Sequence, residues 1–156
     1  MPDRELYAVE YAEAFHDDAS ALKEQFVNDL ELWRPVDFVK QKERRFDLVL
    51  VVNVLNTIPE EAHRQSVFAT LAGRLNPNGW LLVYQRIWAE SENPTGAIEY
   101  GDGWLIPQPH HSYYTYRACT GNRWFTKAAA ALGLRELPTA ESSSSNVILR
   151  LWEKPF

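Results

Sequence analysis

An asparagine directly follows the apolar run FDLVLVV at residues 46–52. The side chain of Asn53 offers one hydrogen-bond acceptor and two donors. If the run is a strand of a parallel sheet, Asn53 lies at its carboxyl end, where open α/β sheets bind their ligands. Its amide could therefore contact a ligand or substrate. Alternatively, Asn53 could cap and orient the following turn, with Asn56 nearby for the same purpose.

A carboxylate ends a second short apolar stretch, LYAVE, in which Glu10 closes residues 6–10. An ionised carboxylate only accepts hydrogen bonds, so it suits a ligand that presents hydroxyl groups. Glu10 could equally be an ordinary exposed glutamate. Asp37 is another acidic candidate, in a segment where Pro35 obscures the register of any strand.

Aromatic and histidine side chains gather between residues 104 and 116. They could stack on a planar ligand, with one histidine serving as a base, or they could form an aromatic lid over the sheet. Two adjacent histidines rarely face one metal ion, and no second cluster of ligands is evident, so we predict no metal site. The group consists of Trp104, His110, His111, Tyr113, Tyr114 and Tyr116.

The elements that must position these residues alternate between strand and helix. The apolar runs at 46–52 and 80–84 are typical of strands buried on both faces of a parallel sheet. Between them, Thr57 as a cap and Pro59 in the first turn predict a helix that extends to residue 75. Strand, helix and strand in this order predict a parallel βαβ unit in an α/β fold. The apolar stripe of the helix is expected at Ala62, Val67, Leu71 and Leu75.

The later elements close the sheet. Residues 126–132 predict a helix that Gly133 stops, and the strands predicted at 134–139 and 147–152 should pair antiparallel. Residues 88–117 interrupt the alternation with prolines and glycines. We expect there an irregular insertion lying over the sheet, which could hold a small hairpin. The other predicted elements are a strand at 6–10, a helix at 13–27, one strand at either 30–33 or 36–39, a charged loop at 40–45 and a turn at 76–79.

The composition limits the class of protein. The chain has 156 residues, of which 46% are hydrophobic, and this fits a single domain with a packed core. A net charge of -5 disfavours a broad nucleic-acid-binding face. Cys119 is the only cysteine, which excludes an internal disulfide and makes a reducing, cytoplasmic setting the default expectation. No apolar run approaches the roughly 20 residues of a membrane span, and no signal-peptide pattern opens the chain.

The stretch FDLVLVVNVLNTIPEEAHRQSVFATLAGRLNPNGWLLV resembles the second half of the class I S-adenosylmethionine-dependent methyltransferases. That family has a strand beginning Phe-Asp, a short turn with an apolar pair, a helix, and a Leu-x-Pro-x-Gly turn into the next strand. Leu75, Pro77 and Gly79 match that turn, while Asn78 stands where a glycine is commoner. The ending NVILRLWEKPF matches the family's closing antiparallel strands. The resemblance implies a Rossmann-like, mostly parallel sheet with an antiparallel C-terminal strand.

The resemblance also implies roles for the candidate residues. Glu10 would accept hydrogen bonds from the ribose hydroxyls of S-adenosylmethionine, and Asp37 would stand near the adenine. Asn53, Val54 and Leu55 would form the turn on the cofactor side. The aromatic and histidine group would help to form the substrate pocket. The implied activity is methyl transfer, which depends mainly on positioning because the sulfonium donor is already activated.

The chain departs from the family at the glycine-rich cofactor loop. In the family this loop precedes the strand that Glu10 closes, and its glycines let the backbone approach the cofactor. Only Met1 to Glu5 precede LYAVE, and no glycine occurs before Gly73. We therefore expect an N-terminally truncated fold. It could be a fragment, a non-catalytic interaction module, or a domain whose site a partner chain completes. The exposed sheet edge would favour a homodimer or a complementing chain.

Overall fold

The structure is a computed structural model that describes residues 5–9, 30–86, 95–108, 114–118, 121–139 and 147–156. The chain divides into two compact units, Met1–Arg44 and Arg45–Phe156. Glu10 and the helix predicted at 13–27 lie outside the described residues. Within the described part of the chain, no helix has the length and apolar character needed to cross a membrane.

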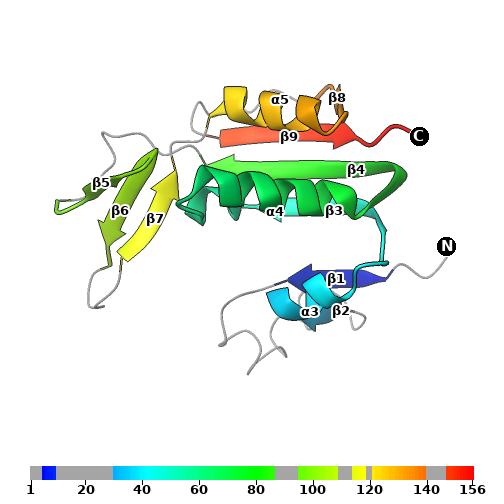
Figure 1. The fold of residues 1–156 in the computed structure, drawn as a ribbon, viewed down its shortest axis with the longest axis horizontal. Helices are drawn as coiled ribbons and strands as arrows, with labels where there is room; N and C mark the ends of the chain where they lie inside the picture. Colours follow the sequence, from blue (N-terminus) through cyan, green and yellow to red (C-terminus); the bar gives the residue numbers. More distant parts are fainter. Residues whose placement is uncertain (1–4, 10–29, 87–94, 109–113, 119–120, 140–146) are drawn as a thin grey trace. The chain divides into compact units, whose positions relative to one another are not determined.

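The first unit contains a parallel pair of short strands, β1 (Leu6–Val9) and β2 (Leu30–Trp33), followed by helix α3 (Pro35–Lys40) (Figure 1). The strand expected at 30–33 is thus confirmed, and the alternative at 36–39 is wrong. Pro35 occupies the first turn of a helix, where its missing N–H is not needed. Asp37 accordingly lies on α3 and not on a strand, with its Oδ1 3.8 Å from Lys40 Nζ.

The second unit is built on a four-stranded mixed sheet in the order β3-β4-β9-β8. β3 (Phe46–Val52) and β4 (Leu75–Arg86) are parallel, and helix α4 (Glu61–Gly73) connects them. β9 (Val147–Glu153) runs antiparallel to β4 and to β8 (Arg135–Leu137). The expected α/β fold, the parallel strand–helix–strand unit and the closing antiparallel pair are therefore confirmed.

Two helices cover one face of this sheet. Helix α5 (Asn122–Ala131) packs beside α4, and Phe68 joins them to the sheet through edge-on contacts with Trp124 and Trp152, at 5.7 and 5.9 Å between ring centroids. Such edge-to-face geometry is favourable for aromatic pairs. The core on this face also contains Val51, Leu55, Ala72, Leu75, Leu81, Val83, Phe125, Ala129 and Ile148.

The expected apolar stripe of α4 is confirmed in part, because Val67 and Leu71 pack against the core and Leu75 is buried at the start of β4. Ala62 is exposed, and the fully buried residues of α4 are Arg64, Phe68 and Ala72, spaced four apart. The expected cap is also wrong, because Thr57 ends the short 3-10 helix η1 (Leu55–Thr57) and donates its hydroxyl to the Val54 carbonyl at 2.7 Å. Arg64 was missed because a search for apolar residues passes over an arginine.

The opposite face of β3 and β4 is exposed. Leu48, Leu50 and Val52 are 47%, 58% and 56% exposed, and Trp80 and Tyr84 are 48% and 42% exposed. The expectation that both strands are buried on both faces is therefore wrong. The physical reason is that α4 and α5 contribute to one core on the other face, and no described element of this unit buries this one. β3 is also an end strand of its sheet, so one of its backbone edges pairs with no described strand of the unit.

Residues 88–117 contain a second sheet, so the expected irregular insertion is wrong, although the small hairpin is confirmed. β5 (Ile98–Tyr100), β6 (Gly103–Pro107) and β7 (Tyr114–Ala118) pair antiparallel. Figure 1 shows this sheet beyond the carboxyl end of β4, where β7 lies against η1. The glycines that suggested irregularity make the turn between β5 and β6, with Gly101 at φ 60.

Positive φ angles also occur after α5 and in the first part of β4. Gly133, at φ 68, follows α5, and the Leu134 N–H bonds to the Ala129 carbonyl at 3.0 Å, which confirms the predicted helix stop. The turn expected at 76–79 is instead the irregular first part of β4. Asn78 has φ 61 there, and the register with β3 shifts in this region.

Candidate functional site

The loop after β3 begins at Asn53, whose backbone is in the left-handed region at φ 52. Its N–H donates to the Tyr84 carbonyl at 2.9 Å, and its Oδ1 accepts a hydrogen bond from the Arg86 N–H at 2.9 Å. Asn53 thus ties the carboxyl end of β3 to that of β4. The structure shows the orienting role that the sequence had left open, and the exposed amide nitrogen is not used by this bond.

The next residues of the loop turn inward. Leu55 is fully buried and belongs to the core, while Val54 is partly buried beside it. Asn56 is 3% exposed, and its Oδ1 has no hydrogen-bond partner among the described residues. Of the predicted cofactor turn, only Asn53 is therefore exposed at the carboxyl end of the sheet.

A fully buried arginine lies at the base of this loop. Arg64 Nη1 donates to the carbonyls of Ile58 and Pro59 at 2.5 and 3.1 Å, and Nη2 pairs with the carboxylate of Asp102 in the β5–β6 turn. The other carboxylate oxygen of Asp102 accepts the hydroxyl of Tyr116 on β7 at 2.6 Å. Sequence reasoning missed Arg64 and Asp102, and the one available signal was a charged residue at a helix position spaced to be buried.

The ionisation of Tyr116 is strongly shifted. Burial, reinforced by the hydrogen bond to Asp102, raises the pKa of Tyr116 to about 12. Its hydroxyl therefore remains protonated at neutral pH and donates to Asp102. A protonated phenol of this kind stabilises the fold through its hydrogen bond and does not serve as a base.

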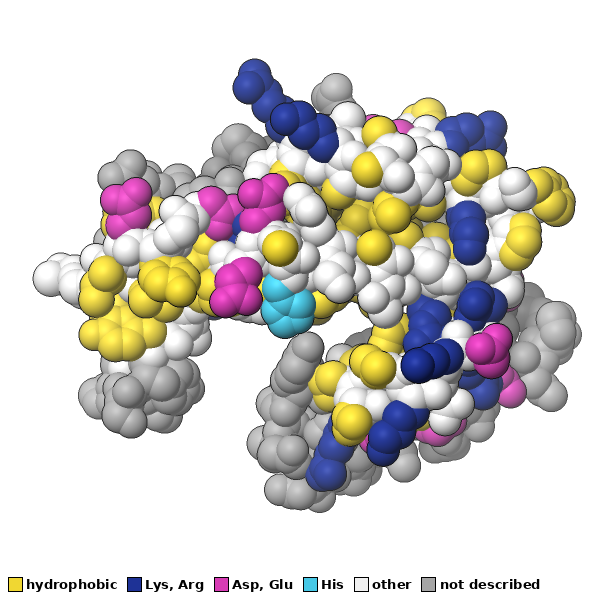
Figure 2. Space-filling view, viewed as in Figure 1, with side chains coloured by type: hydrophobic (Ala, Val, Ile, Leu, Met, Phe, Trp, Pro, Cys, Tyr) yellow, Lys and Arg dark blue, Asp and Glu magenta, His cyan; other side chains and the backbone are white. Residues whose placement is uncertain are grey.

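Strand alternation divides the predicted substrate residues between two faces of the second sheet. Tyr114 and Tyr116 share a face with Tyr100, whose ring lies 6.3 Å from that of Tyr116, edge-on. Trp104 pairs with Arg117 and lies on the opposite face. Figure 2 shows hydrophobic side chains gathered over this sheet, where Tyr100 and Tyr114 are half exposed. His110, His111 and Tyr113 lie outside the described residues.

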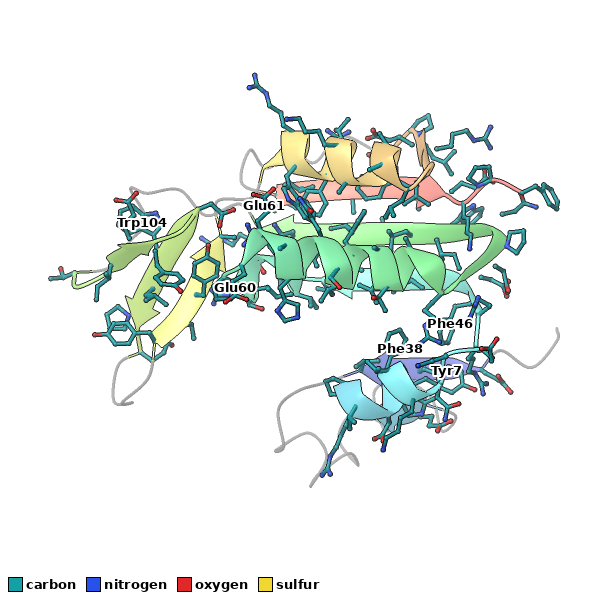
Figure 3. The ribbon with its side chains drawn as sticks, in the orientation of Figure 1. Tyr7, Phe38, Phe46, Glu60, Glu61 and Trp104 are labelled. Carbon is teal, nitrogen blue, oxygen red and sulfur yellow. The ribbon has the colours of Figure 1, made fainter. Side chains whose placement is uncertain are left out.

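Acidic side chains lie at the N-terminal end of α4. Glu60 and Glu61 are both exposed there (Figure 3), and carboxylates at this end interact favourably with the helix dipole. No group of three or more histidine, cysteine, aspartate or glutamate residues that could hold a metal ion occurs in the described ranges.

The first unit has its own polar and aromatic cluster at the start of β1. The Arg44 guanidinium lies 4.3 Å from the centroid of the Tyr7 ring and pairs with Glu5. The Tyr7 and Trp33 rings are 4.6 Å apart. Burial raises the pKa of Tyr7, and its hydrogen bond to Glu5 contributes to the increase. Arg44, expected in a solvated loop, is therefore held against aromatic rings.

The arrangement of strands, helices and carboxyl-end loop has counterparts among solved structures. Over 98% of its length, the chain matches an S-adenosylmethionine-dependent methyltransferase from Clostridium acetobutylicum ATCC 824, with a TM-score of 0.70 and 12% identity, covering 76% of that chain. The chain has the class I methyltransferase fold. The Rossmann-like architecture expected from the sequence is thereby confirmed.

Two further solved structures show the same methyltransferase-like fold. The PH0226 protein from Pyrococcus horikoshii OT3 matches 96% of the chain with a TM-score of 0.72 and 16% identity, over 71% of its own length. CalS10 of Micromonospora echinaspora, an amino pentose methyltransferase with S-adenosylmethionine bound, matches 96% with a TM-score of 0.63 and 12% identity, over 74% of its length. At these identities the likeness concerns the fold. No protein-family model and no curated protein matches the chain.

Proposed function

We propose that this chain is an S-adenosylmethionine-dependent methyltransferase domain. The observation that supports this most is the methyltransferase fold over 98% of the chain, with an exposed asparagine at the carboxyl end of the strand next to the crossover helix. Open α/β sheets bind ligands at this end. CalS10, which has the same fold, carries S-adenosylmethionine.

The cofactor would lie along the loop after β3. In this proposal Asn53 contacts the cofactor through its amide nitrogen, while Val54 and Leu55 set the loop against the core. Glu10 would accept hydrogen bonds from the ribose hydroxyls, and Asp37 would stand near the adenine. The bound cofactor would supply an activated methyl group, so the contribution of the protein is to bind, orient and exclude water.

The methyl acceptor would lie against the second sheet. The exposed Tyr100 and Tyr114 offer flat apolar surface, which suits a planar or apolar acceptor. Trp104 is on the other face of this sheet and would not contact an acceptor bound against Tyr100 and Tyr114. The remaining members of the candidate group are His110, His111 and Tyr113. Tyr116 is buried on the same face and would support the Tyr100 ring rather than contact the acceptor.

We also propose that another polypeptide covers the exposed face of β3 and β4, either as a second copy or as a complementing chain. Parallel sheets are normally covered on both faces, and a long apolar end strand favours pairing. The chain spans only 71–76% of the solved structures described above, although they match nearly all of it.

Calorimetry and thermal shift with S-adenosylmethionine and with its demethylated product test the function. We expect saturable binding of both, with Glu10→Gln weakening it about tenfold, because a charged acceptor for the ribose hydroxyls is lost. Glu43→Gln, at an exposed loop glutamate, is the matched control and should bind like the unmodified chain. If millimolar ligand produces no heat of binding and no thermal shift, the proposal that this chain binds the cofactor on its own is wrong.

A further inference from the structure

We propose that Arg64 is a positioning residue that fixes the loop after β3 and the β5–β6–β7 sheet to each other, through Asp102. This inference rests on the proposed function, because it assigns the cofactor to the loop and the methyl acceptor to the sheet. The new element is that the buried guanidinium of Arg64 fixes the position of the loop after β3 relative to the β5–β6–β7 sheet.

On the cofactor side, Arg64 holds the segment that connects η1 to α4. Its Nη1 bonds to the carbonyls of Ile58 and Pro59, two consecutive residues of that segment. The segment is also folded locally, since the Thr57 N–H bonds to the Val54 carbonyl at 3.1 Å. Movement of the guanidinium would therefore displace the whole loop that begins at Asn53.

On the substrate side, Arg64 holds the sheet through its first turn. Asp102 lies between β5 and β6, and its two carboxylate oxygens accept from Arg64 and from Tyr116 on β7. The carboxylate thus joins two parts of the second sheet to α4. Gly103 makes this close approach possible, because a side chain there would overlap the Arg117 carbonyl and come within 2.6 Å of the Tyr116 hydroxyl.

The chemistry of this cluster requires an arginine. The planar guanidinium of Arg64 contacts three oxygen atoms, those of the Ile58 and Pro59 carbonyls and of the Asp102 carboxylate. The ammonium of a lysine cannot present the same rigid fork. Arg64 is fully buried, and the Asp102 side chain is 46% exposed. Removing the charge of Asp102 would leave Arg64 without its counter-charge in the core, so the pair is sensitive to substitution at either end.

Hydrogen exchange on the ligand-free chain tests the positioning role without depending on methyl transfer. Asp102→Asn keeps the shape of the side chain and removes its charge. We expect amides at 98–107 and 114–118 to lose protection about tenfold, while those of β4 are unchanged. Glu136→Gln is the matched control, because Glu136 forms a surface pair with Arg150 and its side chain is 36% exposed.

A second measurement follows ionisation and coupling. In Asp102→Asn, the pKa of Tyr116 should fall from about 12 toward its ordinary value while remaining raised by burial, as measured by ultraviolet titration against Tyr116→Phe. In the unmodified chain, S-adenosylmethionine should protect amides of the second sheet, and Arg64→Lys should abolish this effect while binding persists.

The outcomes separate this inference from the proposed function. Unchanged exchange in the second sheet of Asp102→Asn would overturn the positioning role whether or not the cofactor binds. Protection of that sheet by the cofactor in Arg64→Lys, equal to that in the unmodified chain, would also overturn it. If the ligand-free results are as expected but no cofactor binds, the mechanical link stands and the assignment of its two ends to cofactor and substrate fails.

Discussion

Asn53 combines two requirements that few side chains meet. Its backbone is left-handed, which asparagine tolerates better than other side chains that are not glycine. Its amide oxygen also accepts the Arg86 N–H and so joins the carboxyl ends of two parallel strands. Asn53 therefore determines the direction in which the chain leaves β3, and with it the position of the loop at this end of the sheet.

Replacing Asn53 with glycine should isolate the side-chain hydrogen bond. Asn53→Gly retains the backbone conformation and loses the bond to Arg86, so we expect a loss of about 1 kcal/mol in the free energy of unfolding. Asn78→Gly is the control at φ 61, where glycine is equally well accommodated. Urea denaturation measures both variants, and equal losses would mean that the Asn53 side chain contributes nothing to stability.

At the scale of the secondary-structure elements, the pairing of β6 with β7 depends on a glycine at the start of β6. Gly103 pairs with Ala118, and its α-carbon faces the Arg117 carbonyl and the Tyr116 hydroxyl. The absence of a side chain at Gly103 therefore lets the first turn and β6 lie close to β7. Any residue with a Cβ would force β6 away from its neighbour.

Gly103→Ala should accordingly destabilise the second sheet. We expect a loss of about 2–4 kcal/mol in the free energy of unfolding, because the new methyl group meets backbone atoms that cannot move aside. Gly73→Ala is the matched control, since a Cβ there meets nothing within 4 Å and alanine favours the helix. A Gly103→Ala variant as stable as the control in thermal and urea unfolding would contradict this account.

At the scale of the whole molecule, the described elements of the unit Arg45–Phe156 cover only one face of its main sheet. The helices α4 and α5 bury one side, and the other presents Leu48, Leu50, Val52, Trp80 and Tyr84 to solvent. Contiguous apolar surface of this kind marks interaction sites in proteins. The proposed partner would therefore complete a sheet rather than add to a closed surface.

Substitution on this face should alter association. If a second copy covers this face, we expect light scattering of the purified chain to report a mass above that of one copy. If a complementing chain covers it, we expect a pulldown with this chain to recover that partner. Leu50→Lys should weaken either one, because a charge would be buried at the contact. Val36→Lys is the control, at a residue of similar exposure on α3. A strictly monomeric chain without a partner, or equal behaviour of the two variants, would contradict the proposal.

The sequence by itself determined the positions of the strands of the main sheet, their closing antiparallel pair and the helix stop at Gly133, but not the strands β5, β6 and β7. Each of these depends on a local signal, namely a continuous apolar run or a residue that tolerates positive φ. The same signals located Asn53 at the end of β3, and the fold resemblance followed from their order. They also suggested that β3 and β4 were buried on both faces, because an apolar run is compatible with burial whether or not a cover exists.

Only the tertiary structure decided which surfaces are covered and which distant residues meet. Arg64 and Asp102 are 38 positions apart, and no local pattern relates them. The separation of Trp104 from Tyr114 likewise depends on the pairing of three strands. Burial and ion pairing are determined by non-local packing, so the sequence could predict the carboxyl end of β3 but not the buried guanidinium that joins the loop after β3 to the second sheet.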